Sequence, residues 1–406
     1  MLAKLFPRIN ARVVSLRILG PLLDQFVVDL HSRGYGALPI RLRVREAPRL
    51  EARLRRCGIR DIRQLSRDDL LAFAPRDAAA DVYMAALVHS LVRFLDQRGL
   101  LKQRAATPAE QLLSAYSSHL QQVRGLAAST VVHHQRTASE FLSFLGFESG
   151  GGLRDLQPVR IEEFVRRLGE RVGRESLQHT VAHLRSFLRF LEIRGEVPRG
   201  LQFSIDTPRV YRGERLPRSL PWETVTAFLK AIDRSTPMGR RDYAMFLLVA
   251  TYGLRTSEIA ALRLDDVEWR ASRIRVRRPK TQSPLVLPLT DPVGAALLDY
   301  LRHARPSLPL REIFLRVRAP SGPLAPTAVT EAFQKWTRRG RLPIPYQGPH
   351  CLRHSLAVHL LRQGASLKAI GDLLGHRSAE STCVYLRLHV EDLRDAGLDL
   401  PAEVRS

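Results

Sequence analysis

Cysteine is nearly absent from this chain of 406 residues. The three cysteines, Cys57, Cys351 and Cys383, are too few and too scattered for a disulfide framework or for a metal site of recognised spacing. We therefore expect them to be small residues of the hydrophobic core.

Long apolar runs are also missing. The longest apolar stretch, residues 243–254, is too short to span a bilayer, and the N-terminus lacks the charged start, apolar core and cleavage site of a leader. We therefore expect a cytoplasmic protein with no membrane partner. With 45% apolar residues and no dominant low-complexity tract, the chain should form two or three packed domains.

Lysine and acidic residues are scarce relative to arginine. The chain holds only six lysines, and its 64 basic residues stand against 40 acidic ones, which gives a net charge of +24. A GC-rich genome would favour arginine over lysine, but that exchange leaves the charge unchanged. A basic surface of this size favours a polyanionic partner, nucleic acid first, with an acidic membrane or protein surface as alternatives.

Two segments of the N-terminal half resemble each other. LVHSLVRFLDQRG at residues 87–99 matches HLRSFLRFLEIRG at 183–195. Upstream, residues 33–34 match 124–125 and residues 62–65 match 153–156 in the same order, so we infer an old duplication. Apolar residues at helical spacing predict a bundle of about four helices for each copy. Chance similarity between arginine-rich amphipathic helices remains the alternative.

A polar linker at residues 210–218 precedes a change of pattern. Strict alternation at 273–277 and branched residues at 285–289 predict a β-hairpin, with Lys280 at or beside its turn. The tail after residue 390 should be partly helical. Helical spacing is found at 224–232, 242–252, 327–339, 350–362, 367–374 and 382–388.

Basic side chains recur at spacings that bring them together. His350, Arg353 and His354 stand at i, i+3 and i+4, so they share one face of a helix. Burial of that face would cost several kcal/mol unless an anion met it, and on spacing alone a solvated basic face is an equal alternative.

Arg255 follows a Gly-Leu turn and precedes a helix that could start at Thr256 or Ser257. There a guanidinium and free backbone N–H groups can both face an anion, and Glu258 can orient the arginine. An ordinary surface Arg/Glu pair is the alternative. His376 and Tyr385, nine residues apart, are individually typical of a structural histidine and a core tyrosine.

Taken in order, these residues resemble the signature of the tyrosine recombinase (phage integrase) family of site-specific DNA recombinases. That signature is an arginine in a G-L-R-x-S-E block, a hairpin lysine, an H-x-x-R block, an L-G-H block and a tyrosine nine residues later. No expected position is substituted over residues 240–390, and the resemblance is looser over 108–200. The matching residues are Arg255, Lys280, His350, Arg353, His376 and Tyr385.

The resemblance implies a mainly α fold with a small β-sheet or hairpin in the C-terminal domain. Residues 1–105 would form an N-terminal helical module, a candidate duplicate of the core-binding domain, and 106–200 the SAM-like core-binding domain that contacts DNA. A linker at 201–214, a catalytic domain at 215–398 and a tail at 399–406 would follow.

The resemblance also implies the chemistry. Tyr385 would be the nucleophile that forms a covalent 3′-phosphotyrosine, His350 would accept its proton, and Lys280 would protonate the departing 5′-oxygen. Arg255, Arg353 and His376 would hold the phosphate, with Glu258 and His354 in support. Lysine at position 280 is notable in an arginine-preferring chain, because arginine is a poor general acid. Neither a metal nor another cofactor is expected.

We therefore expect a DNA-breaking and rejoining enzyme, an integrase or transposase of a mobile genetic element. Its partners would be double-stranded DNA recombination sites, on which it would form a homotetramer, with or without accessory recombinases. Three alternatives are Xer-like chromosome dimer resolution, a type IB topoisomerase and a non-catalytic DNA-binding regulator.

Overall fold

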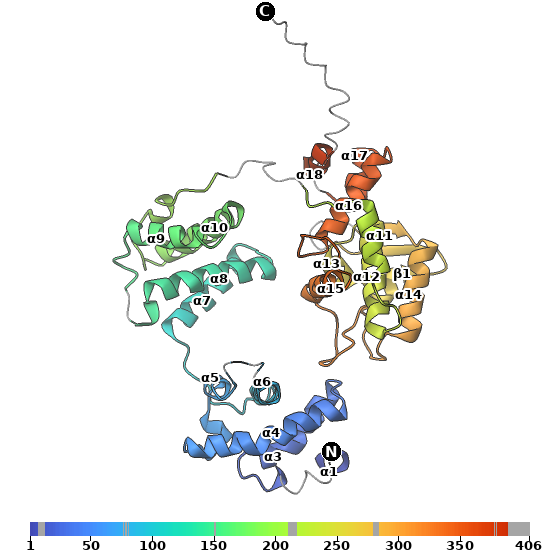
Figure 1. Ribbon diagram of the computed structural model, residues 1–406. Coiled ribbons are helices and arrows are strands. Elements are labelled where there is room, and N and C mark those ends of the chain that lie inside the picture. The colour runs from blue at the N-terminus through green and yellow to red at the C-terminus, as the bar shows by residue number, and fades with distance from the viewer. Residues whose placement is uncertain are drawn as a thin grey trace, which may run out of the picture. The chain divides into compact units, whose positions relative to one another are not determined.

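The computed structural model describes residues 1–6, 13–75, 77, 79, 81–149, 152–209, 217–278, 284–376, 378 and 380–388 (Figure 1). By its internal contacts the chain divides into two compact units, residues 1–102 with 215–406 and residues 103–214. Large apolar cores form separately within residues 2–101, 109–205 and 220–352. A small fourth core surrounds Tyr385.

The first 102 residues form a helical bundle around one of these cores. The helix α4 is amphipathic: Ile40, Val44 and Leu50 are buried, while arginines cover its other face. Glu51 on the buried face accepts backbone N–H groups of Arg17 and Leu19 at 2.7 and 3.0 Å, at the start of α3. The elements are α1 (Leu2–Leu5), α3 (Gly20–Ser32), α4 (Ala37–Arg56), η1 (Ile62–Gln64), α5 (Arg67–Leu71) and α6 (Val82–Asp96).

Residues 103–214 form a second helical bundle. Thr107 caps its first helix by accepting the N–H of Glu110, whose carboxylate accepts the N–H of Thr107 in return. The elements are α7 (Pro108–Ser118), the π-helical η2 (His119–Val123), α8 (Ala128–Leu145), η3 (Phe147–Ser149), α9 (Pro158–Gly169), α10 (Arg174–Ile193) and η4 (Leu201–Phe203).

The two bundles share local features at the positions that match in sequence. Gly34 and Gly125 both end a helix with positive φ, at +80° and +61°. Each bundle also has an arginine guanidinium over a phenylalanine ring of its last long helix, Arg98 over Phe94 at 4.1 Å and Arg194 over Phe190 at 5.5 Å.

The C-terminal part packs helices around the third core, with a small antiparallel sheet in the order β1-β2-β3. In β2, Ile274 and Val276 point into the core and Arg273 and Arg275 point to solvent. The elements are α11 (Trp222–Lys230), α12 (Pro237–Tyr252), α13 (Thr256–Ala261), η5 (Leu264–Asp266), β1 (Val267–Glu268), β2 (Arg273–Val276), β3 (Leu285–Pro288), α14 (Asp291–His303), α15 (Pro326–Arg339), α16 (His350–Arg362), α17 (Leu367–Leu374), α18 (Glu380–Cys383) and η6 (Val384–Leu388).

The expected fold class, mainly helical with a small β-hairpin, is confirmed, and β2 and β3 form the hairpin as an antiparallel pair. Three elements of the C-terminal part were not predicted: the helix α14, the short helix η5 and the short strand β1. The prediction that all cysteines are core residues is wrong: Cys351 is buried, but Cys57 and Cys383 are exposed at helix ends. The hairpin turn with Lys280, most of the predicted linker and the tail lie outside the described residues.

Among the helices that the model describes, none combines the length and the apolar composition needed to cross a membrane.

Candidate active site

Arg353, on the first turn of α16, is the centre of the predicted cluster. Its side chain is buried, with 2% of the residue exposed. It donates hydrogen bonds to the carbonyl of Gly253, at the end of α12, and to that of Leu374, at the end of α17, the latter at 2.5 Å. The C-terminal ends of helices carry negative partial charge, so they suit a buried cation. The alternative of a solvated basic face does not hold for this residue.

Arg255 lies at the N-cap of α13, two residues after Gly253. Its guanidinium donates to Glu258 at 2.8 Å, and its backbone N–H donates to the second oxygen of the same carboxylate at 2.8 Å. Glu258 is 3% exposed, whereas the Arg255 side chain is 30% exposed. The buried carboxylate therefore holds an arginine that still reaches solvent, as predicted from the spacing of three.

Arg278 adds a third guanidinium group to the site, and it was not predicted from the sequence. It follows β2, is 7% exposed, and lies with Nε 3.7 Å from Glu258 while donating to the carbonyl of Leu373 at 2.7 Å. The alternation in RIRVRR was the available signal, because Ile274, Val276 and Arg278 fall on the same, inward face.

Tyr385 lies in η6 and is 1% exposed, packed against Ala357, Ile370 and Leu374. Its hydroxyl is 2.9 Å from Nδ1 of His354, one turn along α16 from His350. The ring of His376 stacks near Tyr385, with centroids 6.2 Å apart and planes at 18°. The helices α16, α17 and α18 pack together (Figure 1), and the contacts of their side chains bring Tyr385, His354 and His376 into one place.

His376 and His350 complete the set of predicted residues that the structure describes. Nδ1 of His376 is 2.8 Å from the hydroxyl of Thr382, a buried residue that no sequence motif indicated. His350, the first residue of α16, is exposed, and its ring stands edge-on to that of His354 at 4.6 Å between centroids. Lys280 lies outside the described residues.

Two glycines allow these segments to approach each other. Gly253 has φ +65°, and a Cβ there would lie 2.5 Å from Cδ2 of Leu374. Gly375 has φ +63°, and its Cβ would lie 1.8 Å from a guanidinium nitrogen of Arg278. A Cβ at either position would force the side chain of Leu374 or Arg278 to move, and both positions have a left-handed φ that L residues rarely adopt.

The electrostatics of the site reflect an excess of positive charge. Burial, with the charge of Arg255, lowers the pKa of Arg353 to about 10. Burial, followed by the charges of nearby basic groups, lowers the pKa of His354 to about 3 and that of His376 to about 4. Desolvation and the charges of Arg353 and Arg255 also lower the pKa of His350. The imidazoles of His354 and His376 are therefore neutral near pH 7 and would gain protons more readily if an anion entered.

Tyr385 shows the opposite shift. Burial raises the pKa of its hydroxyl group, and the positive charges of Arg353 and Arg255 oppose that rise. The hydroxyl is therefore protonated at neutral pH, with its oxygen 2.9 Å from Nδ1 of the neutral His354. Among the described residues, no group of three or more His, Cys, Asp or Glu side chains is placed to hold a metal ion.

A helical domain with a small antiparallel sheet, in which a tyrosine lies among arginines and histidines, fits the class of protein that the sequence predicts. Comparison with known proteins agrees. The phage integrase family model matches residues 218–392, and the model of the phage integrase N-terminal SAM-like domain matches residues 113–195. The chain belongs to the phage integrase family of tyrosine recombinases.

Its relatives include integrases and Xer recombinases. The putative integrase/recombinase y4rA of Sinorhizobium fredii (strain NBRC 101917 / NGR234) is 34% identical over 388 residues, 94% of each chain. The tyrosine recombinase XerC of Roseiflexus sp. (strain RS-1) is 32% identical over 289 residues, which cover 68% of this chain and 89% of XerC. A lambda integrase tetramer bound to a Holliday junction shares the fold, with a TM-score of 0.52, 17% identity and coverage of 73% of this chain and 86% of that chain.

Proposed function

We propose that this recombinase cuts and rejoins DNA at specific sites through a covalent bond between Tyr385 and a DNA 3′-phosphate. The observation that carries the proposal is the charge around this tyrosine. Arg255 and Arg278 both contact one buried carboxylate, Glu258, while among the described contacts Arg353 donates to backbone carbonyls. Three guanidinium groups thus lie near a single carboxylate. A phosphodiester would supply the missing negative charge.

The roles follow from what each group can do. Arg255 and Arg353 hold the non-bridging oxygens and stabilise the charge that builds in the transition state, and removing one such donor typically costs about 3–4 kcal/mol. His376 donates to the same phosphate. Glu258 and His354 position these groups through the contacts described above.

In the reaction, Oη of Tyr385 forms a bond to phosphorus and the bond from phosphorus to the 5′-oxygen breaks. The phenol proton passes to His350, and Lys280 donates a proton to the departing 5′-oxygen. The phosphotyrosine keeps the bond energy, so a 5′-hydroxyl can attack it and restore the DNA without an energy source. No metal or cofactor takes part in this scheme.

The Tyr385 hydroxyl must first leave its hydrogen bond with His354. In the structure it is buried, protonated and paired, which makes it a poor nucleophile. An anion bound by Arg255 and Arg353 would favour protonation of His354, whose Nδ1 could then no longer accept a hydrogen bond, while His350 stays neutral to accept the phenol proton. Phosphate binding thereby supports release of the tyrosine.

For the biological role we propose integration or transposition of a mobile genetic element. The similarity to y4rA over 94% of each chain supports this over chromosome dimer resolution, because the XerC relative covers only 68% of this chain. Its partners would be double-stranded recombination sites, met in the cytoplasm by a homotetramer, with or without accessory recombinases. A topoisomerase or a non-catalytic regulator is less favoured, because the described site residues match the family at every position.

We also propose the domain division given above, with residues 1–105 as a duplicate of the core-binding module at 106–200. The matched positive-φ glycines and the matched arginine–phenylalanine contacts support the duplication.

The test is a covalent trap. Nicked suicide duplexes made from the DNA that flanks the gene should yield a protein–DNA adduct with the native chain, and Tyr385→Phe should yield none. Tyr346→Phe, a tyrosine near α16 but outside the cluster, serves as the control and should form the adduct at the native rate. An adduct that persists in Tyr385→Phe would remove this residue from the nucleophile role.

A further inference from the structure

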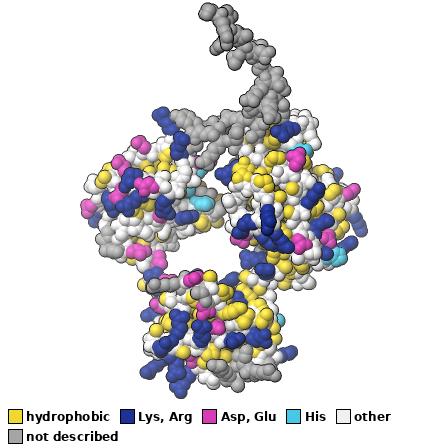
Figure 2. Space-filling view, in the orientation of Figure 1, with side chains coloured by type: hydrophobic (Ala, Val, Ile, Leu, Met, Phe, Trp, Pro, Cys, Tyr) yellow, Lys and Arg dark blue, Asp and Glu magenta, His cyan; other side chains and the backbone are white. Residues whose placement is uncertain are grey.

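The helix α4 carries an exposed row of arginines. Arg41, Arg45, Arg49 and Arg56 fall at i, i+4, i+8 and i+15, within a stripe of about 80° on a helix with about 100° per residue. Arg55 borders the same stripe and is exposed as well. Residues 41–60 hold eight arginines and two glutamates, an excess of six positive charges. In Figure 2, Lys and Arg side chains gather in groups on the visible face of the module that contains α4.

Carboxylates neutralise only one arginine of this row. Arg49 pairs with Glu46 at 2.6 Å and with Asp81 at 3.1 Å, and Glu51 faces inward to the backbone at the start of α3. Within the part of the chain that the structure describes, no ion pair links Arg41, Arg45, Arg55 or Arg56 to a carboxylate. Like charges at i, i+4 destabilise a helix, so the row lowers the stability of α4 unless a bound polyanion neutralises it.

We propose that the exposed face of α4 binds the phosphate backbone of double-stranded DNA, as a contact separate from the catalytic domain. The row from Arg41 to Arg56 extends about 22 Å along the helix axis, which matches about six phosphates of one strand at 3.4 Å spacing. Guanidinium groups suit phosphate oxygens because they donate in a planar fork.

This contact goes beyond the matched family models, which begin at residue 113. The inference about α4 rests on the proposed function, because it assumes that the ligand of the arginine row is DNA. The predicted consequence is additional, sequence-independent affinity that anchors the recombinase beside its site.

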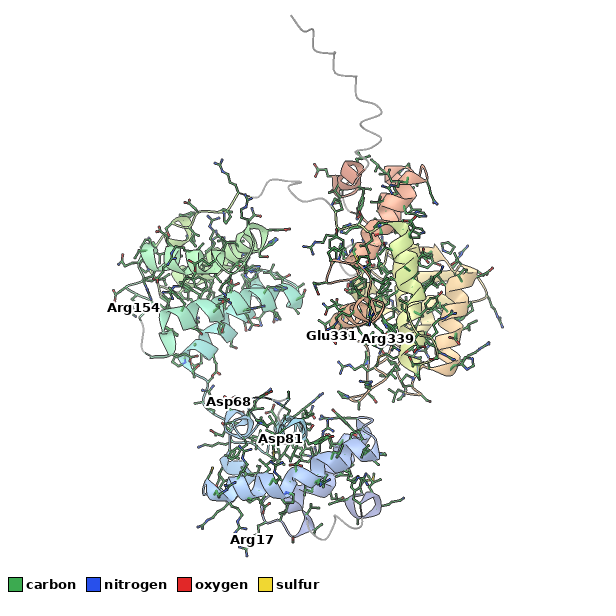
Figure 3. All side chains as sticks on the ribbon, viewed as in Figure 1. Arg17, Asp68, Asp81, Arg154, Glu331 and Arg339 are labelled. Carbon is green, nitrogen blue, oxygen red and sulfur yellow. The ribbon has the colours of Figure 1, made fainter. Side chains whose placement is uncertain are left out.

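The experiment compares two full-length variants with the native protein. The first carries Arg41→Gln, Arg45→Gln, Arg55→Gln and Arg56→Gln, since glutamine keeps a helix propensity near that of arginine. The control removes four charges from exposed positions of the same module outside α4, namely Lys4→Gln, Arg17→Gln, Arg93→Gln and Lys102→Gln. Arg17 is labelled in Figure 3.

The readout is binding to a short duplex of unrelated sequence, measured by fluorescence anisotropy between about 50 and 200 mM salt. We expect the α4 variant to bind at least about tenfold more weakly at 0.1 M salt, with a salt slope shallower by about 3 to 4. The control should change either quantity much less. Helix content and melting temperature should match the native protein for both variants.

Three outcomes would overturn the inference: an α4 variant that binds like the native protein, equal losses in both variants, or unchanged DNA binding together with altered self-association. The last would assign the row to a protein partner. If the native chain itself bound no duplex DNA, the proposed function would fail instead, and the two failures are therefore distinguishable.

Discussion

Arg278 lies where three parts of the site meet, and its neighbours define its role. It contacts Glu258, which holds Arg255, and the carbonyl of Leu373 beside the His376 turn. We expect Arg278→Leu to slow single-turnover DNA cleavage about a hundredfold, because shifts of about 1 Å in catalytic groups have effects of that size. Affinity for the same DNA should change much less, since the exposed Arg255 remains.

Arg275→Leu is the matched control for that measurement. Arg275 lies in β2, three residues before Arg278, on the opposite, exposed face, where it pairs with Glu268. Arg278→Lys should recover only part of the rate, because one ammonium group cannot serve Glu258 and Leu373 with the geometry of a guanidinium. Cleavage by Arg278→Leu within twofold of the native rate would show that Arg278 has no positioning role.

The residues of the site differ in how far the sequence could predict them. Arg255, Arg353, His376 and Tyr385 were found through their order and spacing, and the structure brings them together. The pairing of Tyr385 with His354 could not be predicted, since it depends on how η6 packs against α16 across 31 residues of chain. Spacing within one helix predicts a shared face, whereas contacts between elements require the packed core.

At the scale of elements, the end of α12 positions the site, because the Gly253 carbonyl there accepts a hydrogen bond from Arg353. In Gly253→Ala, the new Cβ would lie 2.5 Å from Leu374 at a φ of +65°. We expect the free energy of unfolding to fall by about 1–3 kcal/mol, from left-handed strain and crowding together. The Gly253 carbonyl would also shift away from Arg353, so cleavage should slow beyond the effect of lost stability. Chemical denaturation and single-turnover cleavage measure the two effects.

Gly294→Ala in α14 provides the comparison. Its Cβ would meet Leu289 at 3.6 Å, an ordinary contact, and alanine in a helix interior typically stabilises by about 0.5–1 kcal/mol. Equal stability of Gly253→Ala and Gly294→Ala would contradict the packing argument.

Most elements of the C-terminal part could be predicted from periodicity, and α16 and α17 have the predicted bounds. The helix α14 was missed because Pro292 and Gly294 near its start are typical of loops. Proline is tolerated in a first helical turn, where its absent N–H breaks no hydrogen bond. The strand β1 has only two residues, which are too few to show an alternating pattern in the sequence.

For the whole molecule, the presence of separate cores matters more than any single contact. Tyr385 belongs to a small core within residues 357–385, and the two N-terminal bundles each have a core separate from that of residues 220–352. We therefore expect each bundle to keep its fold when residues of the other parts are substituted. Similarity between the bundles predicted two such units, and the arginine excess of residues 41–60 can be counted from the sequence, but which of those arginines are exposed could be known only from the structure.

The assembly on DNA distinguishes a recombinase from a monomeric topoisomerase that uses the same groups. Strand exchange joins two duplexes, so each of four cut strands needs its own tyrosine, and the lambda integrase relative forms a tetramer on a Holliday junction. We expect Tyr385→Phe, which halts cleavage, to assemble as four chains of 45.9 kDa on two duplexes taken from the DNA flanking the gene. Mass photometry would measure this stoichiometry, with unrelated duplexes as the control. If single chains bound each duplex while the native chain still formed the covalent adduct, the chemistry would stand but the recombinase assignment would give way to a topoisomerase.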